Sequence, residues 1–245
     1  MVGGIFSQAG YFVGNALWPG RDSNPKGFFE DREINDINET LLAQVLPARP
    51  SFTLRPYRLH KWLFLDRPTG FQRWLSYVPV GTQIPSPLAI IERIKSQIAQ
   101  RPYCFKDPRF CYTLPVWQPY LDNTVFVCVF RDPASTVESI LKECRSAEYL
   151  HDLRMTRQLA IRIWTQMYKH VLEKHRHQGE WLFIHYSQVL TTEGLDRLQS
   201  FTGAVVDRRF PDPSLRRTVS HEPVPRATGR VYQELCKLAK YSDES

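Results

Sequence analysis

The chain alternates between short apolar runs and longer stretches in which apolar and polar residues are interleaved. Two runs, TVFVCVF at 124–130 and WLFIHY at 181–186, predict buried strands, because β-branched and aromatic residues follow one another without a polar break. Residues 102–105 predict a third, shorter strand. Apolar residues spaced by three and four predict helices, at 31–46, 87–100, 133–145, 152–175, 187–201 and 228–241. This alternation predicts an α/β fold, with a central parallel sheet and helices on both faces.

The N-terminal pattern predicts a strand, a turn and a helix. Residues 2–6 are apolar, residues 7–10 are small or polar, and a second apolar stretch covers 11–17. A turn between a strand and a helix directs backbone N–H groups toward one place, where an anion can bind. The residues expected to form this anion site are Ser7, Gln8, Ala9, Gly10, Tyr11 and Phe12.

Residues 48–85 follow no single period and are rich in proline and aromatic residues. They predict a loop-rich insertion with one or two short helices. It is either a lid over a substrate or a peripheral packing segment. The whole chain of 245 residues, 42% of them hydrophobic, fits one domain over 1–245 better than two small ones.

The net charge of +7 favours an anionic partner, although scattered surface Lys and Arg explain it equally well. Net charge is the only feature that supports nucleic-acid binding, so a nucleic-acid partner is not expected. The five cysteines form no CxxC pair, so neither a metal site nor a disulfide framework is expected. No apolar run approaches the roughly 18 residues of a membrane span, and the first residues do not resemble a signal peptide. A cytoplasmic protein is the simplest expectation.

The strongest chemical signal follows the run at 124–130. Arg131 stands at the end of this strand, Pro133 suits the first turn of a helix, and Ser139 lies eight residues after the arginine. An arginine donates paired, charge-assisted hydrogen bonds to a phosphate, and a serine hydroxyl adds another. Ligands of open α/β sheets bind beyond the carboxyl ends of the strands, which is where this arginine lies. The alternative is an arginine that pairs within the fold, for instance with Asp132.

The segment Arg131-Asp132-Pro133 with Ser139 resembles the 3′-phosphate motif of sulfotransferases that use 3′-phosphoadenosine 5′-phosphosulfate (PAPS). The resemblance implies a P-loop-like sulfotransferase fold, PAPS as cosubstrate, and sulfuryl transfer to a hydroxyl or amine of a small molecule or glycan. The turn at residues 7–12 then corresponds to the family's 5′-phosphosulfate loop. Gln8 and Phe12 depart from the basic and hydroxyl residues of that loop.

The resemblance also implies catalytic residues. Lys106, which lies 25 residues before Arg131, corresponds to a lysine that stabilises the transferring group, and Lys106-Asp107-Pro108-Arg109 resembles bacterial members of the family. Glu30 is the first candidate for the base that deprotonates the acceptor, and Asp107 is the second. The alternatives are that Lys106 pairs with Asp107 on the surface, and that Glu30 begins the next helix.

Two weaker matches concern the nucleotide. Tyr186 resembles a family tyrosine that follows a strand, and Arg216 and Arg217 stand in a tail that closes over the nucleotide in family enzymes. Because Gln8 replaces a basic residue, a second hypothesis stays open. In it the chain is a sulfotransferase-fold protein that binds a nucleotide or an anionic glycan without catalysis.

Overall fold

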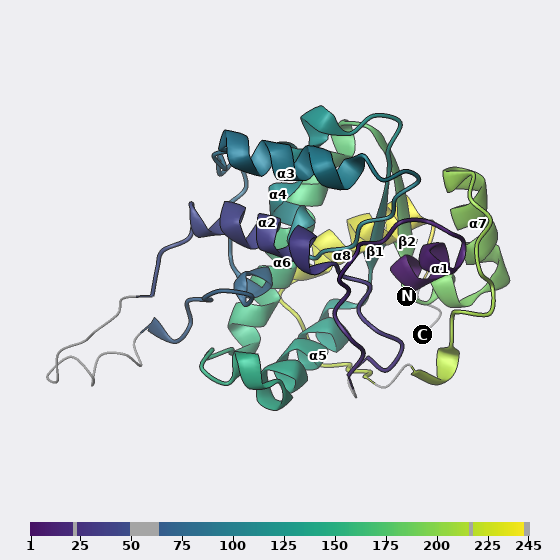
Figure 1. Ribbon diagram of the computed structural model, residues 1–245. Coiled ribbons are helices and arrows are strands. Elements are labelled where there is room, and N and C mark those ends of the chain that lie inside the picture. Colours follow the sequence, from purple (N-terminus) through teal and green to yellow (C-terminus); the bar gives the residue numbers. More distant parts are fainter. Residues whose placement is uncertain (22–23, 50–63, 216–217, 243–245) are drawn as a thin grey trace, which may run out of the picture.

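The computed structural model describes residues 1–21, 24–49, 64–215 and 218–242 (Figure 1). Its α-helices are α1 (Val2–Gln8), α2 (Arg32–Ala43), α3 (Leu88–Ile98), α4 (Phe110–Trp117), α5 (Pro133–Ser146), α6 (Arg157–Glu173), α7 (Thr192–Thr202) and α8 (Arg226–Ala239). Its strands are β1 (Val125–Phe130) and β2 (Glu180–His185), and short 3₁₀ turns stand at Arg73–Leu75, Gln118–Tyr120, Glu148–Leu150, His175–His177, Gln188–Leu190 and Pro213–Leu215.

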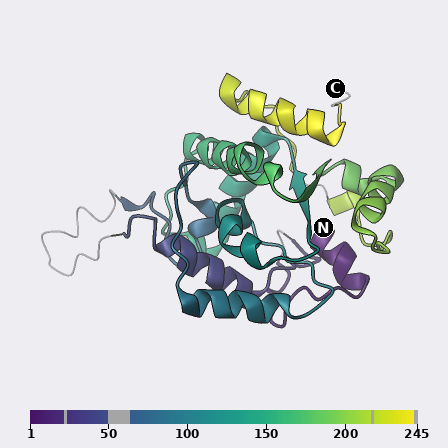
Figure 2. The ribbon, with the colours of Figure 1, turned by 90° about the horizontal axis from the view of Figure 1, so that it is seen from above.

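The two strands are parallel, and the register runs from Val125 opposite Glu180 to Phe130 opposite His185. The strands lie side by side, with α1 and α7 to one side of them (Figure 1), and α8 lies alongside α6 (Figure 2). An isolated parallel bridge also joins Phe12 to Tyr103. The chain is thus an α/β protein, and the sheet formed by its described residues has two strands.

Both long apolar runs form the predicted strands, and most of the amphipathic stretches form the predicted helices. Helix α2 begins after Asp31, whose carboxylate accepts hydrogen bonds from the amides of Glu33 and Ile34. Its apolar positions are fully buried against α3 and α4. Helix α5 begins with Pro133 after Asp132, whose side chain accepts from the amide of Ser135. These two caps set where α2 and α5 start beside the candidate site.

Four local predictions are wrong. Residues 102–105 carry an isolated bridge at Tyr103 rather than a strand. Residues 2–6 belong to helix α1 rather than to a strand, and residues 11–17 form no helix. The predicted helix at 187–201 starts later, because Thr191 rather than Ser187 accepts the capping hydrogen bond, from the amide of Gly194. Helix α4 was not predicted at all.

The predicted insertion at 48–85 lies partly outside the described residues. Its described part, 64–85, contains the 3₁₀ turn Arg73–Leu75, and Leu75 and Val78 are each only 1% exposed. This part packs against the core, while Phe71 and Trp74 line the cavity described below. Among the described helices, none has both the length and the apolar character that crossing a membrane requires.

Candidate functional site

A cavity of about 720 Å³ lies at the carboxyl end of β1. Its size is that of a site for a small molecule or cofactor. Five of the predicted site residues line it, although they come from four separate segments of the chain: Glu30, Lys106, Arg131, Ser139 and Tyr186. The cavity lies where ligands of open α/β sheets bind.

Arg131 and Ser139 line the same cavity, as the spacing of the motif predicts. Arg131 follows the last residue of β1, and its guanidinium lies 5.3 Å from the centre of the Tyr186 ring. Stacking on an aromatic face helps to hold a guanidinium in one orientation. Ser139 is exposed two turns along α5, and Thr136 lines the cavity between them. Thr136 is not among the predicted site residues, although its spacing of five residues from Arg131 is a usable signal.

Lys106 and Glu30 form an ion pair at the wall of this cavity. The Lys106 side chain is 44% exposed and the Glu30 side chain is 13% exposed. The expected alternative for Lys106, a surface pair with Asp107, does not occur: its partner is Glu30, 76 residues away. An ammonium and a carboxylate therefore meet at the wall of the cavity, as proton transfer and charge stabilisation require.

Lys26 adds a second ammonium to the cavity wall. Its Nζ donates to the backbone carbonyl of Phe210 at 2.6 Å and lies 3.6 Å from a carboxylate oxygen of Asp212. These contacts hold Phe210 and Asp212 at the cavity wall, and Leu215 and Thr218 also line the cavity. The predicted nucleotide-closing residues, Arg216 and Arg217, lie outside the described residues.

Arg21 is a further cation of the cavity and is not among the predicted site residues. Its guanidinium lies 5.2 Å from the centre of the Tyr149 ring, and both side chains line the cavity. Burial raises the pKa of Tyr149 above its ordinary value. Nothing in the local sequence links these two residues, because 128 positions separate them.

Asp107, the second candidate base, lies outside the cavity lining and is buried. Its carboxylate accepts from the amide side chains of Asn35 and Asn38, each at 2.9 Å, and from the backbone amide of Arg109 at 2.8 Å. The Arg109 guanidinium donates to it as well, at 3.0 Å. A carboxylate satisfied in this way supports the fold, so the prediction of Asp107 as a base in the cavity is not supported by its position.

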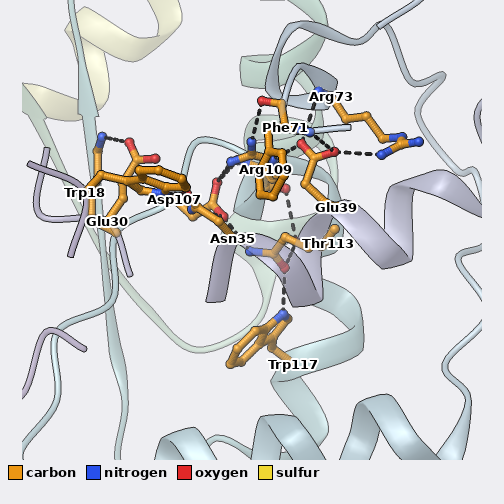
Figure 3. Close-up of polar contacts among 12 residues, drawn as sticks. Trp18, Glu30, Asn35, Glu39, Phe71, Arg73, Asp107, Arg109, Thr113 and Trp117 are labelled. Carbon is orange, nitrogen blue, oxygen red and sulfur yellow. Dashed lines mark hydrogen bonds and ion pairs between the residues drawn. The ribbon is translucent and has the colours of Figure 1, made fainter. Parts of the chain in front are cut away.

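The same network continues to Glu39, which accepts from the Arg109 guanidinium at 2.6 Å and from that of Arg73 at 2.8 Å. Burial alone would lower the pKa of Arg109, but the Asp107 and Glu39 carboxylates raise it above its ordinary value. Asn38 in turn accepts from Thr113 and Trp117 on α4. The buried polar network, defined as Asn35, Asn38, Glu39, Asp107, Arg109, Thr113 and Trp117, thus fixes the segment that carries Lys106 onto α2 and α4 (Figure 3).

The turn at Ser7–Phe12 does not form the predicted anion site. Ser7 and Gln8 are the last residues of α1, and the chain turns directly after them. The amides of Ala9 and Tyr11 donate to the carbonyl of Phe6, and that of Gly10 donates to the carbonyl of Ser7. The amide of Phe12 donates to Pro102. These N–H groups are used within the fold, and the carboxyl end of a helix disfavours an anion. Neither Gln8 nor any other residue of this turn lines the cavity.

Comparisons of the chain with protein-family models, with curated proteins and with solved structures found no match. The assignment of a function therefore depends on the geometry of the cavity. In the described part of the chain, no three His, Cys, Asp or Glu side chains are grouped as ligands of a metal ion.

Proposed function

We propose that this chain is a sulfotransferase that moves a sulfuryl group from PAPS to a hydroxyl or amine of a small-molecule or glycan acceptor. One observation carries the proposal: Glu30, Lys106, Arg131, Ser139 and Tyr186 line one cavity. The sequence predicts for these residues different chemical roles that a single site must combine. On this proposal, β1 and β2 belong to a larger parallel sheet with helices on both faces, of the P-loop-like sulfotransferase type.

The 3′-phosphate of the nucleotide would bind between Arg131 and Ser139. The guanidinium supplies charge-assisted hydrogen bonds, and the exposed hydroxyl of Ser139 supplies one more. Tyr186 holds the arginine through its ring face. The Thr136 hydroxyl donates its proton to the carbonyl of Asp132 at 2.8 Å, so Thr136 lines the cavity without a free donor for the phosphate.

The transfer itself would use Lys106 and Glu30. The acceptor oxygen or nitrogen attacks the sulfur, and the bond from sulfur to the oxygen of the 5′-phosphate breaks. Glu30 takes the acceptor proton, and Lys106 neutralises the negative charge that develops on the leaving oxygen. Their ion pair keeps both groups at the cavity wall before ligands bind.

A second function is favoured by the turn at Ser7–Phe12. The amides of this turn are used within the fold, so it offers no cradle for the 5′-phosphosulfate. The chain alone would then hold a nucleotide by its 3′-phosphate, or an anionic glycan, without transferring sulfate.

Calorimetry with adenosine 3′,5′-bisphosphate, the desulfated product, tests both versions. We expect saturable binding that Arg131→Ala weakens about a hundredfold, because a charge-assisted phosphate contact is lost. Arg162→Ala is the matched control, since Arg162 is an exposed arginine whose guanidinium stacks on Tyr77 outside the cavity lining. Absence of binding, or equal binding by the Arg131 variant, overturns the proposal.

Transfer of radiolabelled sulfate from PAPS to pooled phenols, lipids and glycans separates the two functions. Labelled product that disappears in Glu30→Gln supports the enzyme. Tight nucleotide binding without labelled product supports the binding protein.

A further inference from the structure

A second cavity, of about 700 Å³, separates β1 from the segment Tyr103–Phe105. We call it the strand slot. One wall is the chain from Thr124 to Val129 and the opposite wall is the chain from Arg101 to Pro108. In the described part of the chain, β1 pairs with β2 on one edge only, so its other edge faces the slot.

The two walls run in the same direction. Their starting ends meet through a hydrogen bond of 2.6 Å between the Tyr103 hydroxyl and the Thr124 hydroxyl. Their carboxyl ends both reach the first cavity, one through Lys106 and the other through Arg131. The slot therefore has the form of a gap in a parallel sheet.

The backbone groups on both walls have the spacing that another strand needs. The carbonyl of Phe130 accepts from Tyr186 after β2, so the alternate residues Val125 and Val127 direct their backbone groups into the slot. On the other wall, Cys104 is bonded to Phe12, so Tyr103 and Phe105 direct theirs into it. Backbone groups that alternate along two facing edges match an extended polypeptide better than a compact small molecule.

Helices close the slot on the two remaining sides. Val127 and Val129 pack against the core cluster that holds Phe6 of α1, whereas Cys128 belongs to the cluster that holds Val171 of α6. Because successive strand residues point to opposite faces, α1 and α6 cover opposite faces of β1. An occupant would thus meet apolar side chains above and below, as a strand inside a parallel sheet does.

We propose that the strand slot binds a parallel β-strand of a partner polypeptide, an extended segment of about five apolar residues. A second copy of the chain is a poor occupant, because its described strands, β1 and β2, are both held in its own core. The carboxyl end of the bound strand would lie beside Lys106 and Tyr168, which line both cavities.

Amide hydrogen exchange, followed by NMR, tests the proposal on the intact chain. The probe is a synthetic peptide of five alternating isoleucine and valine residues flanked by lysines, and the control peptide has proline at its centre. We expect the Val127 and Phe105 amides to exchange at least about tenfold more slowly with the probe. The Cys128 amide, which faces β2, should be unchanged. If the Val127 amide is already protected before any peptide is added, and this protection rises with protein concentration, the slot binds a second copy of the chain. That result would overturn the proposal.

Fluorescence anisotropy with the labelled probe gives an independent measurement. Val127→Pro removes an N–H that faces the slot and leaves the residues that face β2 unchanged. We expect it to weaken binding by on the order of tenfold, while the control Val127→Thr, which keeps the N–H, changes binding little. No saturable binding of the probe to the unmodified chain, or equal binding of the proline peptide, would also overturn the proposal.

Discussion

The segment Lys106–Arg109 divides its charged side chains between two regions that differ in burial. Lys106 reaches the open cavity with 44% of its side chain exposed, whereas the side chains of Asp107 and Arg109 are 0% and 3% exposed in the buried polar network. Every oxygen of Asp107 is used by a donor from α2 or from Arg109. The charges of the cavity, in contrast, face a space of ligand size.

This difference indicates how neighbouring charged residues acquire different functions. A buried charge must be matched by partners, because burying an unmatched one costs several kcal/mol. Once matched, it holds the fold and has little capacity left for a ligand. The network therefore positions the cavity residues, and the cavity residues carry the chemistry.

Breaking the network should produce the largest effect on stability. We expect Asp107→Ala to lower the free energy of unfolding by about 3–5 kcal/mol, because it removes one of the two carboxylates that pair with the buried Arg109 guanidinium and the shared acceptor of two buried amide side chains. Urea denaturation at neutral pH measures this. The matched control is Asp122→Ala, at a side chain that is 83% exposed and lies 3.9 Å from Arg101. We expect that control to lose less than about 1 kcal/mol. Equal losses for the two variants would remove the distinction between the regions.

The sequence predicted the cavity better than it predicted the network. Arg131 directly follows β1 and Ser139 lies in the next helix, so local patterns fix both where they lie and which way they point. The fate of Asp107 depends on Asn35 and Asn38, which lie 72 and 69 residues away. The spacing of residues within the segment Lys106–Arg109 does not reveal such distant contacts. The sequence alone therefore leaves Asp107 as a candidate base.

The failed fold predictions have physical causes as well. An apolar run as short as residues 2–6 fits a strand and a buried helix equally, and only packing on the core decides. In α1, Ile5 and Phe6 pack against residues of β2 and α7. Helix α4 holds Pro115 and is apolar nearly all round, so neither propensity nor periodicity reveals it.

The comparison between buried and exposed groups also applies to the histidines. There, the pH dependence of stability tests it. His175 is buried and its Nε2 lies 2.8 Å from the carbonyl of Cys111. Burial lowers the pKa of His175 to about 4, with a smaller contribution from His170. Its ordinary value is about 6.5, so the unfolded chain binds the proton first as the pH falls. The stability that comes from neutral His175 is complete above about pH 6.5 and is lost as the pH falls toward 4.

We therefore expect the protonation of His175 to lower the free energy of unfolding by about 2 kcal/mol when the pH falls from 7.5 to 5. Denaturation measured at both pH values should show that the stability of His175→Gln falls by about 2 kcal/mol less than that of the unmodified chain. His177→Gln, at an exposed neighbour on the same 3₁₀ turn, should follow the unmodified chain. If the stability of all three proteins falls equally between the two pH values, burial does not lower the pKa of His175.

The smallest expected effect on stability belongs to Lys106, and it is paired with an effect on the ligand. Because its side chain is 44% exposed, Lys106→Ala should change the free energy of unfolding by less than about 1 kcal/mol. In calorimetry with adenosine 3′,5′-bisphosphate we expect affinity to fall about tenfold, since an ammonium at the cavity wall is lost. Gln8→Ala is the control from the turn whose amides are used within the fold, and it should leave the affinity unchanged. If the Gln8 variant binds adenosine 3′,5′-bisphosphate as weakly as the Lys106 variant, the turn at Ser7–Phe12 belongs to the binding site. A Lys106 variant that unfolds as readily as Asp107→Ala would show that both charges of the segment serve the fold.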